Sequence, residues 1–262
     1  MEKVKIKGIK HVIAIVSGKG GVGKSTIAAQ FALTLATRGY KTGLLDADIY
    51  GPSIPKMFNI ENERPSIDPA IDNHKMLPIE RQNIKINSIG FFVEPEKAII
   101  WRGPMTSNAI TQLITETYWG NLDYLIIDFP PGTGDIQITT MQKFDIDGAI
   151  VVTTPQSIAL NDARKGAEML LNEKIGVPLL GIVENMSWFT PSSHPNEKYF
   201  IFGTGGGQRL AKELNVPLLA KIPLVLEVGD AVEHGLDLVQ IKDQTVLSTF
   251  DNLIKSVINR FE

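Results

Sequence analysis

The chain has 262 residues, of which 43% are hydrophobic and 21% charged, with a formal net charge of −3 and no cysteine. This composition can form one large core, provides no overall basic field for nucleic acid, and excludes disulfides and thiolate metal sites. No apolar run approaches the ~18 residues that span a bilayer, and the apolar stretch behind the N-terminal lysines is too short for a signal peptide. We therefore expect a cytoplasmic protein that binds neither nucleic acid nor, stably, a membrane.

The first predicted elements are a strand over residues 11–17 and a helix over 26–38. The strand is a short β-branched run, and the helix carries apolar residues at helical spacing before Gly39 ends it. The connection between them matches the pattern G-x-x-x-x-G-K-[ST]. A strand, this loop and a helix, in that order, predict a phosphate-binding loop composed of Gly18, Lys19, Gly20, Gly21, Val22, Gly23, Lys24, Ser25 and Thr26.

Each residue type in this loop meets a demand of a polyphosphate ligand. Glycines allow backbone N–H groups to approach phosphates, and the helix N-terminus favours negative charge. Lys24 would place its ammonium near the β and γ phosphates, and the Ser25 hydroxyl would coordinate Mg²⁺. The sequence therefore predicts ATP or another nucleoside triphosphate as a ligand, with Lys24 also serving catalysis.

Acidic residues follow two further predicted strands. Lys41 to Leu45 precedes Asp46 and Asp48, and a second apolar run from Tyr124 ends at Asp128. Because ligands of open α/β sheets bind at the carboxyl ends of the strands, these acids can converge on one crevice. We expect Asp46 and Asp128 to join Ser25 at Mg²⁺; the alternative is that the acids cap turns.

The rest of the chain continues to alternate between strand and helix patterns. Strands are predicted at 84–89, 148–153, 179–183 and 217–220, and helices at 105–118, 157–174, 207–214 and 245–261. This alternation predicts an α/β fold in which a mostly parallel, doubly wound sheet has helices on both faces. We expect a single P-loop NTPase domain over residues 1–262, with an irregular excursion at 60–82.

Lys19 gives the loop the form K-G-G-x-G-K-[ST], which resembles the deviant Walker A group of ATPases that includes ParA and MinD. Further motifs are similar to those of the Mrp/ApbC family within that group and occur in the same order. They are Leu45-Asp-Ala-Asp-Ile-Tyr-Gly-Pro-Ser53, Trp101-Arg-Gly-Pro104, Asp123 to Asp135, Thr154-Pro-Gln156, Gly181-Ile-Val-Glu-Asn-Met186 and Phe202-Gly-Thr-Gly-Gly-Gly207.

The resemblance implies a role for each matching residue. Lys19 would reach the partner's phosphates in a face-to-face homodimer, much as an arginine finger does. Asp48 would orient the attacking water, with Asp46 as a supporting acid. Residues 130–134 would form a second switch that senses the γ-phosphate, and Asn185 would bind adenine through its amide. The expected activity is hydrolysis of ATP to ADP and phosphate.

The same resemblance implies iron–sulfur cluster assembly or carriage, with iron–sulfur apoproteins or assembly factors as partners. The family's cluster ligands are a Cys-Pro-x-Cys pair, whereas residues 187–204 of this chain contain no cysteine. Serine hydroxyls and a histidine are poor replacements for thiolates. We therefore predict an ATPase of this type that holds no cysteine-ligated cluster.

Two other functions stay open at this stage. A ParA/MinD-like switch would use its ATP cycle for partition or positioning, and the amphipathic pattern at 245–261 could address a membrane, although packing on the sheet is the simpler use. A ligase or small-molecule kinase shares the architecture, and residues 101–102 could contribute to a second substrate pocket.

Overall fold

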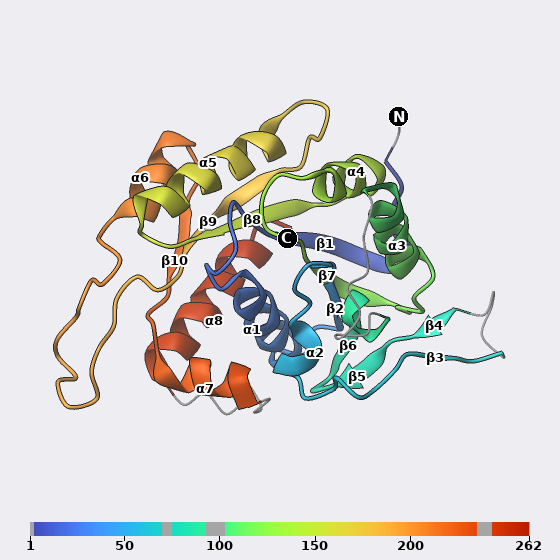
Figure 1. Cartoon of the computed structure of the whole chain (residues 1–262), viewed down its shortest axis with the longest axis horizontal. Helices are drawn as coiled ribbons and strands as arrows, with labels where there is room; N and C mark the ends of the chain where they lie inside the picture. The colour runs from blue at the N-terminus through green and yellow to red at the C-terminus, as the bar shows by residue number, and fades with distance from the viewer. Residues whose placement is uncertain (1–2, 70–74, 93–102, 235–242, 262) are drawn as a thin grey trace.

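An eight-stranded sheet runs through the molecule in the order β10-β9-β8-β1-β7-β2-β6-β5 (Figure 1). The computed structural model describes residues 3–69, 75–92, 103–234 and 243–261. All pairings in this sheet are parallel except that of β5 with β6. The strands are β1 (Ile9–Ser17), β2 (Thr42–Asp46), β5 (Ile79–Arg81), β6 (Ile84–Ser88), β7 (Leu122–Asp128), β8 (Gly148–Thr153), β9 (Leu179–Glu184) and β10 (Leu218–Lys221).

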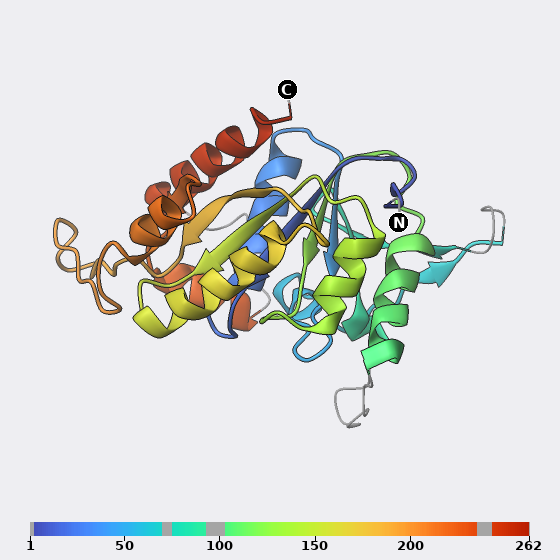
Figure 2. The ribbon, with the colours of Figure 1, turned by 90° about the horizontal axis from the view of Figure 1, so that it is seen from above.

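Two helical layers cover the sheet, one on each face (Figure 2). The alternation along β1 shows why: Ile13 and Ile15 belong to one core, while Ala14 and Val16 belong to the other. One layer contains α1 (Lys24–Thr37), α2 (Ile54–Met57), α7 (Leu226–His234) and α8 (Gln244–Ile258). The other contains α3 (Gly103–Thr115), α4 (Asp135–Lys143), α5 (Ser157–Leu171) and α6 (Gly206–Glu213). The predicted α/β fold is confirmed.

Helix α8 uses its apolar face for packing. Val246, Phe250, Leu253 and Val257 are each at most 3% exposed and belong to the core beside α1. That face is therefore covered by the sheet and α1 and does not face solvent. Among the described residues, none of the helices is both long enough and apolar enough to cross a membrane.

The excursion at 60–82 is more ordered than the sequence suggests. It contains an antiparallel pair, β3 (Ser66–Ile67) with β4 (Met76–Leu77), and it ends in β5, which extends the main sheet. The α-helices α2, α4 and α7 were not predicted, and neither was the short 3-10 helix η2 (Ile89–Phe91). Of these, α2 and α4 matter for the site, because each begins within eight residues of a strand's carboxyl end.

Candidate nucleotide-binding site

The phosphate-binding loop follows β1 and folds as its glycines permit. Gly21 and Gly23 have φ angles of +79° and +83°, in the left-handed region that favours glycine. A Cβ on Gly23 would lie 2.3 Å from Asn185 Nδ2, and one on Gly18 would lie 2.0 Å from the Asp162 carbonyl carbon. The loop borders a cavity of about 240 Å³ whose walls include Lys24 and Asp48.

The ammonium of Lys24 lies among carboxylates at the centre of this site. Its Nζ donates a hydrogen bond to Asp128 Oδ1 at 2.7 Å, lies 3.4 Å from Asp48 Oδ2, and lies 3.3 Å from Ser25 Oγ. The sheet produces this arrangement, because β1, β7 and β2 are neighbours and Asp46 pairs in register with Asp128. The structure thus brings together residues that lie at or beyond the carboxyl ends of three separate strands.

Burial controls the charges of these groups. Burial of the Lys24 ammonium disfavours its charge, but Asp128 and Asp48 outweigh this and raise the pKa of Lys24. Burial, with a further contribution from the charge of Asp128, raises the pKa of Asp46 to about 7. Burial also raises the pKa of the Asp128 carboxyl, although Lys24 opposes that shift. Three buried carboxyl groups share one ammonium, so the site has room electrostatically for another cation.

Asp46 has a different environment from the other two acids. It is fully buried and accepts hydrogen bonds from Asp48 N at 3.1 Å, Ile54 N at 3.1 Å and Ser88 Oγ at 3.0 Å. These contacts fix the segment that carries Asp48 and the start of α2. Sequence reasoning missed Ser88, because its role depends on the pairing of β2 with β6 and no local pattern reveals that pairing.

The residues present fit a magnesium ion. Asp48 Oδ1 and Asp128 Oδ2 are buried oxygens with no hydrogen-bond partner. The Ser25 hydroxyl lies 3.3 Å from Lys24 Nζ, which contacts both of these carboxylates. Carboxylate and hydroxyl oxygens are the ligands that Mg²⁺ prefers, usually together with water and substrate phosphates. Within the described residues there is no cluster of three or more His, Asp or Glu side chains able to hold a metal without such help.

Lys19 differs from Lys24 in its contacts. Within the part of the chain that the structure describes, its side chain makes no ion pair or hydrogen bond, while the Lys19 carbonyl accepts one from Ser17 Oγ at 2.9 Å. The side chain is half-buried at the wall of the loop cavity, which also includes Pro131. Gln137 of α4 donates a hydrogen bond to the Pro130 carbonyl and so attaches the predicted second switch to a helix.

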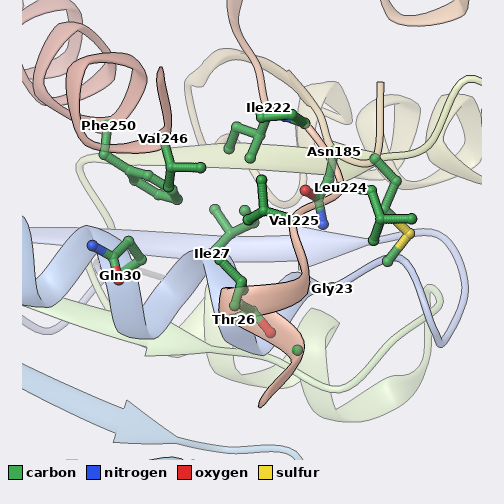
Figure 3. A pocket seen from close by; sticks show the side chains of 14 residues that line it. Gly23, Thr26, Ile27, Gln30, Asn185, Ile222, Leu224, Val225, Val246 and Phe250 are labelled. Carbon is green, nitrogen blue, oxygen red and sulfur yellow. The ribbon is translucent and has the colours of Figure 1, made fainter. Parts of the chain in front are cut away.

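Asn185 lies where β9 ends, against the phosphate-binding loop. Its side-chain Nδ2 donates to the Val22 carbonyl at 2.9 Å, and the residue is 7% exposed. It also borders a second cavity, of about 260 Å³, between α1, α7, α8 and the segment after β10 (Figure 3). The cavity begins at Gly23 and Asn185, so it opens from the nucleotide site into the apolar layer behind it.

Comparison with known proteins identifies the family. Residues 8–258 match the ParA family described as NUBPL iron-transfer P-loop NTPases. The chain belongs to this family. Its relatives include a protein of Methanocaldococcus jannaschii described as an iron-sulfur cluster carrier protein, 44% identical over 257 residues, which are 97% of this chain and 86% of the relative. The family predicted from the motifs is thereby confirmed.

Bacterial relatives of this NUBPL-type NTPase carry the same description. The Haemophilus influenzae protein is 47% identical over 96% of this chain and 67% of its own length, and the Escherichia coli protein is 50% identical over 88% and 61%. The chain thus spans about two thirds of the length of these relatives.

Solved structures support the fold. A nucleotide-binding protein from Archaeoglobus fulgidus, solved in complex with ADP, is 35% identical, with a TM-score of 0.76 and 88% of each chain covered. MinD of Pyrococcus furiosus, a cell division ATPase, is 22% identical, with a TM-score of 0.68 and 96% of this chain and 99% of that chain covered, a likeness that concerns the fold alone.

The loop at 187–204 of this NUBPL-type NTPase is attached firmly at its base. Phe189 and Tyr199 exchange two backbone hydrogen bonds, of 2.9 and 2.8 Å, and Leu224 N donates to the Trp188 carbonyl at 2.7 Å. Lys198 Nζ lies 4.2 Å from the centre of the Trp188 ring. The base of the loop is therefore held by the backbone and tied to Leu224, which borders the second cavity.

Ser193 and His194 lie at the exposed end of the 187–204 loop and contact each other at 2.9 Å, with no acidic cluster beside them among the described residues. Residues 101–102, the suggested second-substrate contribution, lie outside the described residues.

Proposed function

We propose that this chain is a Mg²⁺-dependent, homodimeric ATPase that acts in iron–sulfur protein maturation without holding a cluster on its own thiolates. The observation that carries the ATPase part is the buried contact of Lys24 with Asp128 and Asp48 beside the phosphate-binding loop. The family membership and the ADP complex of the Archaeoglobus fulgidus protein support it.

The geometry suggests how the residues share the reaction. Without nucleotide, Lys24 neutralises Asp128 and Asp48. With ATP, Lys24 turns towards the β and γ phosphates. Ser25 and Asp128 would hold Mg²⁺, which would supply charge neutralisation in the reaction. Asp48 accepts a hydrogen bond from the attacking water through its free Oδ1. The water oxygen bonds to the γ-phosphorus as the bond to the β–γ bridging oxygen breaks. ADP leaves with the bridging oxygen, and both protons of the water remain on the phosphate product.

This assignment gives Asp46 a supporting task. Both of its oxygens accept hydrogen bonds from the protein, so it positions Asp48 and α2, while Asp128 has the oxygen available for the metal. Asp46 then supports the site by fixing the backbone of Asp48 and the start of α2, without direct contact with the ion.

Support for a homodimer comes from the edge of the sheet that carries the phosphate-binding loop. Large exposed apolar side chains follow the carboxyl ends of strands on both sides of β1: Tyr50, Phe92, Ile158, Tyr199, Phe200, Ile201 and Leu226. Where such side chains gather in one patch, exposed apolar surface marks interaction sites. Lys19, whose side chain has no ion pair or hydrogen bond among the described residues, lies on this edge, which suits a twofold contact in which each subunit meets the same face of the other.

The role in iron–sulfur protein maturation rests on the relatives, which are described as iron-sulfur cluster carrier proteins. Because this chain has no cysteine, we place its action on apoproteins or assembly factors in the cytoplasm, with the 187–204 loop as a protein contact. The ATP cycle would then control association with those proteins.

Anaerobic reconstitution with iron and sulfide, with and without ATP, tests the proposal. We expect less than one cluster equivalent of bound iron and no absorbance band of a [4Fe–4S] cluster, because serine and histidine do not replace thiolates. ATP turnover is expected to remain intact. Stoichiometric cluster absorbance would refute the cluster-free assignment. Absence of ATP turnover in the folded protein would refute the ATPase assignment.

Lys24 is the residue on which nucleotide binding depends most. We expect Lys24→Ala to weaken ATP binding by about 100-fold, the effect of losing a charge-assisted contact in a buried site. Titration calorimetry measures the affinity, and Lys165→Ala, which removes a lysine with a 70% exposed side chain, is the control. Because loss of Lys24 leaves buried carboxylates unpaired, Lys24→Arg is compared alongside and its fold checked by circular dichroism. Wild-type affinity in a folded Lys24→Ala variant would contradict the assignment.

A further inference from the structure

One buried carboxyl group joins the two ends of the 187–204 loop. Glu184 ends β9 and is 2% exposed. Its Oε1 accepts a hydrogen bond from Ser187 Oγ at 2.9 Å, and its Oε2 accepts one from Gly207 N at 2.5 Å. Ser187 begins the loop, and Gly207 lies in the first turn of α6, directly after the loop returns from its excursion away from the sheet (Figure 1). The side chain of Glu184 therefore holds the base of this loop closed.

The glycines at the start of α6 make room for this contact. A Cβ on Gly207 would lie 2.9 Å from both Cβ and Oε2 of Glu184, and one on Gly206 would lie 2.7 Å from the Pro155 carbonyl oxygen. The first N–H groups of a helix have no partner within the helix and favour a carboxylate. The glycine-rich motif that ends at Gly207 thus brings the start of α6 against Glu184, which belongs to the motif at 181–186.

The residues that follow Glu184 connect this closure to the phosphate-binding loop. Asn185 Nδ2 donates a hydrogen bond to the Val22 carbonyl at 2.9 Å. Met186 has a φ angle of +54°, a left-handed conformation that is unfavourable for a residue with a side chain. Such a conformation persists only where neighbouring contacts hold it, and here those contacts are made by Asn185 on one side and Ser187 on the other. Release of either contact lets Met186 relax and so disturbs the other.

We propose that Glu184 is a positioning residue that couples the 187–204 loop to the phosphate-binding loop. This inference rests on the proposed nucleotide function and names the side chain through which phosphate binding reaches the loop. Bound phosphates hold the backbone of residues 18–26, and with it the Val22 carbonyl that Asn185 contacts. Asn185 then stays in place, and the Glu184 carboxyl group keeps both ends of the 187–204 loop together. Without nucleotide, the base of the loop opens more often.

Tryptic cleavage after Lys198 measures how often the loop opens, because a protease cuts a chain that is locally unfolded. In the unchanged protein we expect saturating ADP to slow this cleavage about tenfold, a typical strength of coupling between two sites. In Glu184→Ala, cleavage without nucleotide is expected to be about tenfold faster, and saturating ADP is expected to leave its rate unchanged. Glu184→Gln is expected to behave like the unchanged protein, because its amide can accept from Gly207 N and donate to the Ser187 hydroxyl.

Two comparisons separate this coupling from a general loss of stability. Cleavage after Lys165, within α5, reports opening of the whole domain and is expected to keep its rate in every variant. Glu116→Ala removes an exposed carboxyl group just after α3 and is expected to keep the effect of ADP at Lys198. If Glu184→Ala speeds cleavage at Lys165 and Lys198 alike, or if ADP still protects Lys198 in that variant, the role of Glu184 is overturned.

The remaining outcomes distinguish the inference from the function on which it rests. If the unchanged protein binds ADP in calorimetry but its cleavage at Lys198 does not respond, the coupling is overturned and the nucleotide function stands. Failure to bind ADP overturns the nucleotide function, and the coupling with it. If Glu184→Ala does not fold, Ser187→Ala takes its place, because it removes one of the two contacts of the carboxyl group. Full protection by ADP in Ser187→Ala would likewise overturn the inference.

Discussion

Replacing Asp48 by alanine is expected to lower ATP turnover by about 1,000-fold while changing ATP affinity by less than about threefold. Asp48 lines the cavity beside the phosphate-binding loop, and its Oδ1 is buried without a partner. Because Asp48 Oδ1 has no other donor, it can accept a hydrogen bond from a water molecule at the γ-phosphate. Without the Asp48 carboxylate, Lys24 keeps its shorter contact, with Asp128. The Lys24 ammonium therefore stays in the site and can still bind the phosphates.

Single-turnover hydrolysis and equilibrium binding, measured on the same preparations, separate the two effects. Asp230→Ala removes an exposed carboxylate from α7 and is expected to leave both quantities unchanged. If Asp48→Ala loses affinity in proportion to turnover, Asp48 acts by holding Lys24 and not by orienting water. Unchanged turnover would remove Asp48 from the reaction.

The sequence revealed those parts of the fold that depend on local pattern. Strand β8 was predicted at its observed residues, 148–153, because a fully buried parallel strand is a continuous apolar run. Helix α4 was missed because its sequence, Asp135 to Lys143, mixes β-branched residues with polar ones and has little apolar periodicity. The order of the strands follows from their pairing in space, and spacing along the chain does not encode it.

The same distinction applies to the site. The phosphate-binding loop and Asp128 could be proposed from sequence because each belongs to one short motif after one strand. Ser88 was not predicted, since it acts through Asp46, a residue of a distant segment. The role of the serine at the end of β6 cannot be predicted from the local sequence, because it depends on the pairing of β6 with β2, which brings the Ser88 hydroxyl to Asp46.

Lys19→Ala is expected to lower ATP turnover by about 1,000-fold, the lower end of the effect of a catalytic cation supplied by a partner. The structure favours this because Lys19 has no partner within its own described chain, while Lys24 is fully occupied by carboxylates. Binding of ATP to the monomer is expected to persist, since Lys24 and the loop backbone remain. Lys7→Ala, an exposed lysine near the N-terminus, is the control in the turnover assay.

Mixing two inactive variants decides whether Lys19 acts across a dimer. In a mixed dimer of Lys19→Ala with Asp48→Ala, the site in the Lys19→Ala subunit keeps its own Asp48 and receives Lys19 from the partner, so that site is complete. The site in the Asp48→Ala subunit stays inactive. With equal mixing, about half of the dimers are mixed and each has one working site, so turnover is expected to return to roughly one quarter of the unchanged level. If Lys19 instead served its own subunit, each subunit would lack one required residue at its own site, and the mixture would be as inactive as its two components.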